Sequence, residues 1–238
     1  ALDKVAWVPM AERYLYLSLA VMSIGGAMLI QRLFMEKKIP SKAVIAAVTL
    51  LLSVNTFATF HRQFDFKDDN SIWRATLKTN PESSMVLCLY GRTVEGDEKR
   101  NAFEKAVSNP EPFKWRAKAT LTLAGFEMAE GNYDEAVQLI EQALKMEKKY
   151  ENYYRAATMI YSSSIKDGTF DLDRIDHALG YFQKAYRKRK TADAIYKIAV
   201  ILKRLGRDTE AKIKFEELIK RHPESEYAEY SKKHLSLD

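Results

Sequence analysis

The 238-residue sequence has one cysteine, four histidines and none of the common catalytic motifs. The single Cys88 excludes a disulfide within the chain, and a lone thiol is more often a small buried apolar residue than a nucleophile. The histidines lack the spacing of metal ligands and stand far apart, at positions 61, 177, 222 and 234. No GxSxG, Walker, HExxH or CxxC sequence occurs. The chain by itself therefore predicts no catalytic residue, no metal site and no cofactor, and leaves open whether it belongs to an enzyme.

Two charged runs have both a local and a functional interpretation. The acidic run at 167–176 lacks the regular ligand spacing and closing glutamate of a calcium loop, so capping of a helix by Asp171 or Asp173 is the simpler interpretation. The basic run at 186–190 either binds anionic lipid or a phosphate-bearing partner, or complements the dipole at a helix end. The net charge is only +6, so nucleic-acid binding is not expected.

Two stretches without a formal charge stand near the start of the chain, at 14–31 and 43–60. Each has eighteen residues, which as a helix cover about 27 Å and approach the ~30 Å hydrocarbon core of a bilayer. We therefore expect residues 1–62 to form a two-helix transmembrane hairpin with spans at about 14–34 and 43–60. A connecting segment at 63–81 follows.

The connector between the two expected spans, residues 31–42, has four lysines and arginines against Glu36 alone. Short loops of this kind stay in the cytoplasm, so we expect a hairpin in a bacterial inner membrane and a periplasmic C-terminal domain. Because the chain begins with Ala1 rather than methionine, we expect further residues to precede it. The polar residues expected to contact a lipid phosphate or the membrane interface are Glu12, Arg13, Tyr14, Tyr16 and Arg62.

Beyond these stretches the sequence repeats itself with helical spacing. Residues 131–150 and 206–225 match in pattern, and residues 175–190 repeat part of it. Gly131 and Gly206 each end one helix, five residues before an alanine of the next. The matching positions are Ala136, Ile140 and Ala143, then Ala178, Phe182 and Ala185, then Ala211, Phe215 and Leu218. This is the pattern of the tetratricopeptide repeat, a helix–turn–helix unit of 34 residues.

The spacing between these repeats indicates where the array carries an insertion. Ala136 and Ala178 are 42 residues apart, whereas Ala178 and Ala211 are 33 residues apart. The first spacing exceeds the 34-residue period by eight residues. The polar loop at 166–173 accounts for this surplus.

The two ends of the repeat array are also recognisable. A degenerate earlier unit lies at 82–112, where Phe103 and Ala106 occupy the second-helix positions, and the polar segment at 225–237 resembles the capping helix of a solenoid. We therefore predict an all-α fold in which residues 82–238 form an α-solenoid. It has about four tetratricopeptide-like repeats and a C-terminal capping helix.

The inner face of such an array is the expected binding surface. It is lined by the first helix of each repeat and can hold an extended peptide or another protein's helix. An inner face that is merely solvated is the alternative for any single residue. The residues expected to project from first helices onto this face are Lys118, Asn152, Arg155, Met159, Tyr196 and Lys203.

Residues 5–84 resemble the terminal part of one group of membrane enzymes. These are GT-C-type glycosyltransferases, similar to protein O-mannosyltransferases, that carry C-terminal tetratricopeptide repeats. The resemblance rests on two blocks, "VPMAERYLYL" at 8–17 and "TFHRQFDFKDDNSIWRATLKTNPESS" at 59–84. The sequence departs from the family pattern at Ser18, where proline is usual, and at Gln63 and Phe66, where asparagine and tryptophan are usual.

The resemblance implies a family that transfers a sugar from a polyprenyl-phosphate donor to acceptors outside the membrane. Its catalytic acid lies in an early extracytoplasmic loop, which has no counterpart in this chain. The main hypothesis is therefore a membrane-anchored interaction or scaffold module that binds a protein or peptide in the repeat groove. It would be the C-terminal part of a GT-C-like enzyme, packed against upstream helices. The alternatives are direct participation in glycosyl transfer and a scaffold subunit of a cell-envelope secretion or motility complex.

Overall fold

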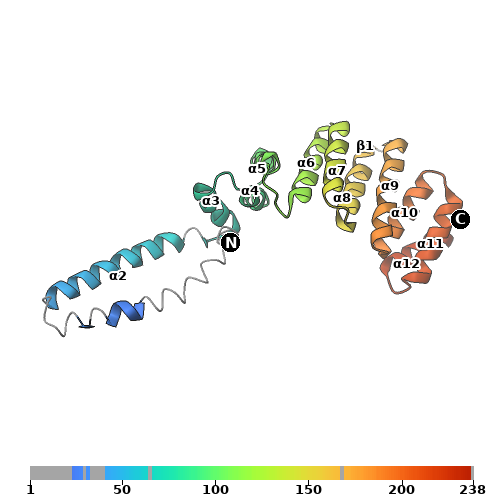
Figure 1. Cartoon of the computed structure of the whole chain (residues 1–238). Helices are drawn as coiled ribbons and strands as arrows, with labels where there is room; N and C mark the ends of the chain where they lie inside the picture. Colours follow the sequence, from blue (N-terminus) through green and yellow to red (C-terminus); the bar gives the residue numbers. More distant parts are fainter. Residues whose placement is uncertain (1–22, 29–30, 33–40, 64–65, 167–168, 237–238) are drawn as a thin grey trace. The chain divides into compact units, whose positions relative to one another are not determined.

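The computed structural model describes residues 23–28, 31–32, 41–63, 66–166 and 169–236. The chain divides into two compact units, Ala1–Lys67 and Asp68–Asp238 (Figure 1). The second of these is called the repeat domain below.

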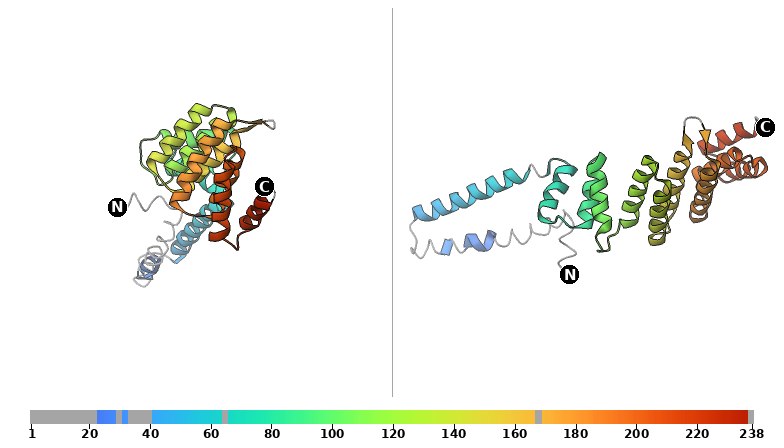
Figure 2. Two further views of the ribbon diagram at one scale, coloured as in Figure 1. Left: turned by 90° about the vertical axis from the view of Figure 1, so that its right-hand side faces the viewer. Right: turned by 90° about the horizontal axis from the view of Figure 1, so that it is seen from above.

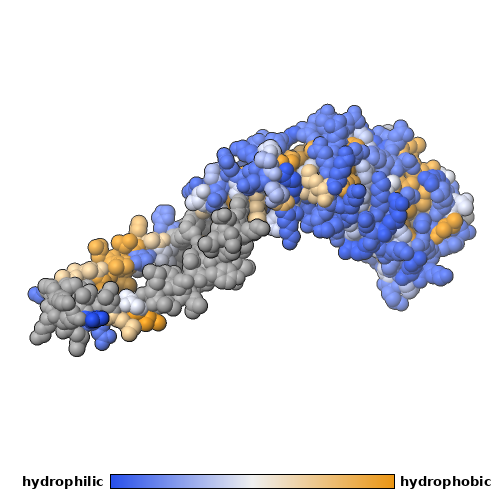
Figure 3. Space-filling view, viewed as in Figure 1, coloured by the Kyte–Doolittle hydropathy of each residue, from blue (hydrophilic) through white to orange (hydrophobic). Residues whose placement is uncertain are grey.

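The N-terminal unit contains one long helix, α2 (Ser41–Gln63), and a shorter helical stretch at 23–28. Apolar side chains along α2 are exposed, with Leu50 at 67% and Phe57 at 71% of their full accessible area (Figure 3). The helix also carries polar groups, among them Asn55, whose side-chain amide donates a hydrogen bond to the Leu51 carbonyl at 2.8 Å.

The prediction of a transmembrane hairpin is wrong on this structure. In the described part of the chain, no helix combines the length and the apolar character needed to cross a membrane. The prediction rested on the length of two stretches without a formal charge. Most of the first expected span, 14–34, lies outside the described residues.

The polar residues predicted at the membrane interface are likewise not described. Glu12, Arg13, Tyr14 and Tyr16 lie outside the described residues, and Arg62 lies in α2 with its side chain outside them. The lysine-rich connector falls mostly in the same undescribed part. The periplasmic location that rested on it therefore stays a prediction.

The repeat domain consists of helices that stand side by side in sequence order (Figure 1 and Figure 2). In its described residues, α4 pairs with α5, α6 with α7, α8 with α9 and α10 with α11, which gives four helical hairpins. The helices are α3 (Asp69–Thr79), α4 (Ser84–Gly91), α5 (Gly96–Ser108), α6 (Arg116–Glu130), α7 (Tyr133–Met146), α8 (Tyr150–Ser163), α9 (Leu172–Lys188), α10 (Ala192–Arg204), α11 (Asp208–Arg221) and α12 (Glu226–Ser236). This arrangement confirms the predicted α-solenoid.

The repeated positions form the core of the array. Ala136 and Ala178, on second helices, are 0% exposed, and Ala211 is 2% exposed, so the paired helices approach closely at these points. Phe182 and Phe215 are each 1% exposed and fill the space four residues further on. The repeated alanine and phenylalanine positions of the sequence are therefore the positions at which the paired helices pack against each other.

Two glycines end first helices as predicted. Gly131 follows α6 with φ 88°, and Gly206 follows α10 with φ 72°, both in the left-handed region that residues with a side chain rarely adopt. The next amide closes the turn in each case: Asn132 N–H donates to the Glu127 carbonyl, and Arg207 N–H donates to the Leu202 carbonyl, both at 2.9 Å.

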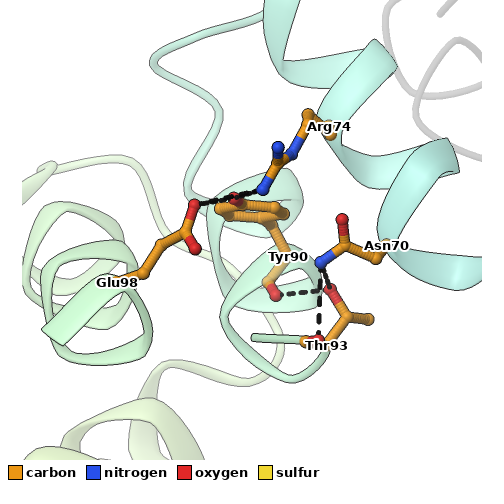
Figure 4. A network of polar contacts seen from close by, with 5 residues as sticks. All are labelled: Asn70, Arg74, Tyr90, Thr93 and Glu98. Atoms are coloured by element: carbon orange, nitrogen blue, oxygen red, sulfur yellow. Dashed lines mark hydrogen bonds and ion pairs between the residues drawn. The ribbon is translucent and has the colours of Figure 1, made fainter. Parts of the chain in front are cut away.

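The first hairpin is held to α3 by a network of polar contacts (Figure 4). Arg74 of α3 donates to the Tyr90 hydroxyl at 3.1 Å, and that hydroxyl donates to the carboxylate of Glu98 on α5. The Asn70 amide lies 3.4 Å from both the side-chain and the carbonyl oxygen of Thr93. Helix α3 thus lies within the segment 63–81 that was predicted as a connector, and it packs on the α4–α5 hairpin of the repeat domain.

The insertion between α8 and α9 forms a short antiparallel pair of strands, β1 (Ile165–Lys166) and β2 (Thr169–Phe170). Asp171 follows β2 and caps α9, because its side-chain oxygen accepts a hydrogen bond from the Arg174 amide at 3.0 Å. The capping interpretation of Asp171 is confirmed. The guanidinium of Arg204, from α10, lies 4.6 Å from the ring centre of Phe170.

Helix α12 packs on the last hairpin at the position that the first helix of a further repeat would take. Its Ala228 is 0% exposed, and His234 stacks on Phe215 of α11 with 4.9 Å between ring centres. Tyr227 lies 5.2 Å from Tyr196 of α10, measured between ring centres. These contacts place α12 on the last hairpin, and its role as a C-terminal cap stays a prediction.

Candidate functional site

A pocket of about 580 Å³ opens between α6 and α8, the first helices of two successive hairpins. It is called the α6–α8 pocket below. Its walls are mainly apolar, and two methionines contribute to them, Met128 from α6 and Met159 from α8. Thr158 and Ser162 also line it. Methionine has an unbranched and flexible side chain, so these walls can adjust to apolar groups of different shape.

The pocket depends on a missing side chain at Gly125, in the middle of α6. A β-carbon built at this position would lie 3.5 Å from the Met159 sulfur, which is ordinary van der Waals contact. An alanine would therefore fit, whereas a longer side chain would project into the pocket. Gly125 has the ordinary backbone conformation of a helix, so its conformational freedom is not what the position requires.

One charged side chain, Arg155 of α8, lines the pocket. Its guanidinium donates to the hydroxyl of Thr122 on α6 at 3.1 Å. Within the described chain, no carboxylate forms an ion pair with this guanidinium. The side chain reaches solvent, yet the packed surroundings lower the pKa of Arg155 because burial disfavours the charged form. The group stays protonated at neutral pH and is satisfied only in part by a neutral partner.

The wall on the α8 side is fixed by Tyr154. Its ring meets Phe182 edge to face with 5.3 Å between centres, and its hydroxyl donates to the carboxylate of Asp193 on α10. Burial, together with that carboxylate, raises the pKa of Tyr154, so its hydroxyl remains a donor. The carboxylate of Asp193 on α10 therefore already accepts a hydrogen bond from α8.

The predicted groove residues take different places in the structure. Arg155 and Met159 line the α6–α8 pocket. Asn152 is 2% exposed, and its amide donates to the backbone carbonyl and the carboxylate of Glu147 at 3.0 and 2.9 Å, so it supports the loop before α8. Tyr196 belongs to the aromatic cluster under α12, with its hydroxyl 3.4 Å from His234 Nε2. Lys118 is exposed on α6, and Lys203 is half-buried on α10.

Several pocket residues were not predicted, notably Gly125, Met128 and Tyr154. A signal was present for Gly125 and for a further pocket residue, Thr158, because each directly follows a fully buried alanine, Ala124 or Ala157, of a first helix. Such an alignment of first helices places them at the same position of successive repeats.

Comparison with protein families gives one match. Residues 193–225, which span α11 and all of α10 but its first residue, match the family described as Tetratricopeptide repeat. A search of curated protein sequences gave no significant match. The resemblance of residues 5–84 to GT-C-type glycosyltransferases therefore stays a prediction, since no comparison bears on it.

Solved structures share the fold at low sequence identity. The chain is similar to PilW, described as a widely conserved type IV pilus biogenesis factor, with a TM-score of 0.56 and 18% identity over 85% of this chain and 94% of PilW. It is similar to YrrB, described as a TPR protein with an unusual peptide-binding site, with a TM-score of 0.51 and 17% identity over 86% of this chain and 97% of YrrB. It is similar to MamA, with a TM-score of 0.53 and 17% identity over 73% and 94% of the two chains. The repeat domain therefore has a tetratricopeptide-type solenoid fold.

Proposed function

We propose that this chain is a protein-interaction scaffold that binds a segment of a partner protein in the α6–α8 pocket. The observation that carries the proposal is a pocket of about 580 Å³ between two first helices, with methionine walls and a single arginine. Its volume lies in the range of about 300–1,000 Å³ typical of binding pockets. The likeness of the fold to a peptide-binding repeat protein, YrrB, is consistent with this use of the surface.

The energetics favour an apolar anchor from the partner. Full burial of one side chain of the size of leucine or methionine contributes about 1.5–3 kcal/mol. Two or three such contacts contribute about 3–9 kcal/mol before the cost of ordering the segment is deducted, so a partner needs polar contacts as well to reach the micromolar range, which corresponds to about 8 kcal/mol. Binding of that strength is suited to an array that assembles partners reversibly.

The proposal is tested by filling the pocket. The Gly125→Leu substitution places a side chain in the pocket, and α6 tolerates it because leucine is a better helix former than glycine. Gly180→Leu is the matched control, since Gly180 lies within α9 with no atom within 4 Å of a β-carbon built there.

The full chain is used to select binders from a displayed library of random 12-residue peptides. Selected peptides are expected to bind the wild type and Gly180→Leu equally, measured by fluorescence anisotropy, and to lose at least about tenfold in affinity for Gly125→Leu. The proposal fails if no peptide is enriched, or if the enriched peptides bind Gly125→Leu as tightly as the wild type. Circular dichroism of both variants confirms that the helices are intact.

A further inference from the structure

We infer that the bound segment carries a side-chain carboxylate next to an apolar side chain, with the carboxylate on Arg155 and the apolar group between Met128 and Met159. This inference rests on the proposed function and adds the chemistry of the ligand. It follows from three observations: the unpaired charge in the pocket, the engagement of the acids nearby, and a second cation at the equivalent position of the next repeat.

The first observation is the hydrogen-bonding capacity of Arg155. A guanidinium has five N–H donors in a planar fork that matches the two oxygens of a carboxylate. In the described structure one contact is made, to the neutral Thr122 hydroxyl at 3.1 Å. The cation lies beside apolar walls and also reaches solvent, and hydrogen bonds between two charged groups are stronger than those between neutral groups. A carboxylate ligand would supply both the missing acceptors and the missing charge.

The second observation is that acids on the helices around the pocket already have partners, among them Glu127 and Glu130 of α6, which both form ion pairs with Arg100. Asp193 accepts the hydroxyl hydrogen bond of Tyr154. Glu151 forms an ion pair with Arg189 at 3.1 Å, and that guanidinium lies over the ring of Tyr150, 4.1 Å from its centre. Burial lowers the pKa of Arg155, and among the described residues no carboxylate counters this effect. The positive charge at the pocket is therefore available to a ligand.

The third observation comes from the register of the first helices. Ala124, Ala157 and Ala199 are each 0% exposed and take the same core position in α6, α8 and α10. The residues two positions before them are Thr122, Arg155 and Lys197. Because Thr122 and Arg155 touch each other, this position faces the adjacent repeat. Lys197 thus places a second cation on the same line, which favours an acidic segment over a neutral or basic one.

The carboxylate is assigned to a side chain because the array extends in both directions from the pocket. Hairpin α4–α5 precedes α6, and hairpin α10–α11 follows α8, so a segment can pass over the pocket without ending there. A chain-terminal carboxylate has the same chemistry and is separated from this assignment by experiment.

The test uses the full chain and the tightest peptide from the 12-residue library. That peptide is synthesised with each acidic residue replaced by its amide, and separately with an amidated C-terminus. Affinity for the wild type, Arg155→Gln and Gly180→Leu is measured by fluorescence anisotropy. We expect one Glu→Gln or Asp→Asn change to weaken binding to the wild type by about tenfold, but binding to Arg155→Gln by less than about twofold. Arg155→Lys should restore part of the loss, since it keeps the charge but not the fork.

The other outcomes separate the two proposals. Peptides that lose affinity for Gly125→Leu but bind Arg155→Gln normally would overturn the carboxylate inference and leave the proposed function in place. Loss of binding on C-terminal amidation alone would overturn the side-chain assignment. Peptides that are insensitive to Gly125→Leu would overturn both proposals together.

Discussion

Glycine-to-alanine substitution is expected to have opposite effects at two places in the repeat domain. Gly180 lies inside α9 and a β-carbon there meets no atom within 4 Å, so alanine gains helix propensity without a clash. Glycine in a helix interior costs about 0.5–1 kcal/mol relative to alanine. The Gly180→Ala variant should therefore unfold with a free energy larger by about that amount.

Gly131 is the counterpart, with equally open surroundings but φ at 88°. The left-handed conformation costs a residue with a side chain about 1–2 kcal/mol, and the loss of chain entropy in the unfolded state returns about 0.4–1 kcal/mol. Gly131→Ala should therefore be destabilising by about 1 kcal/mol, through the backbone rather than through a steric clash.

Urea unfolding of the full chain, followed by circular dichroism at the helical band, measures both effects. With a slope of about 2 kcal/mol per molar urea, the midpoint should rise by about 0.2–0.5 M for Gly180→Ala and fall by about 0.5 M for Gly131→Ala. Midpoints are compared because repeat arrays can unfold in stages. Shifts in the same direction for the two variants would refute the assignment of these glycines to a helix interior and a left-handed cap.

Two further predictions concern the core and the effect of pH. Phe182→Ala removes a side chain that is 1% exposed and should lower the free energy of unfolding by about 3–5 kcal/mol, whereas a loss below 1 kcal/mol in urea unfolding would contradict its place in the core. Burial lowers the pKa of His177, whose Nδ1 lies 2.8 Å from the Tyr133 hydroxyl, so its neutral form is favoured in the folded state. The stability that this adds is present above the unfolded-state pKa of about 6.5 and declines as the pH falls toward the lower folded-state value. Urea midpoints of the wild type and His177→Gln should therefore differ less at pH 5 than at pH 8, and an unchanged difference would exclude this linkage.

The core of the repeat domain was predictable because close helix packing demands small residues at fixed intervals. Ala136, Ala178 and Ala211 could be recognised for that reason, and the structure buries all three. The transmembrane hairpin was predicted from two uncharged stretches, and in the described residues no helix is long and apolar enough to cross a membrane.

The pocket was less predictable than the core, because its properties depend on contacts between residues far apart in the sequence. Arg155 was recognised from its helix, but its hydrogen bond spans 33 residues to Thr122. Asn152 belongs to the same helix and was expected on the open face. It is instead buried, and its side-chain amide donates a hydrogen bond to the Glu147 carbonyl in the preceding loop. A polar residue at a helix start can serve either purpose, and periodicity does not distinguish them.

The packing of α12 on the last hairpin has a consequence for how such an array can change its number of repeats. Tyr227 and Ala228 of α12 make the contacts that the first helix of another hairpin would make against α10 and α11. The same surface could therefore accept an inserted hairpin, with α12 shifted outward to close the longer array. Duplication or loss of one hairpin would lengthen or shorten the array without redesign of the remaining core, so the length of a segment bound as proposed could evolve independently of its chemistry.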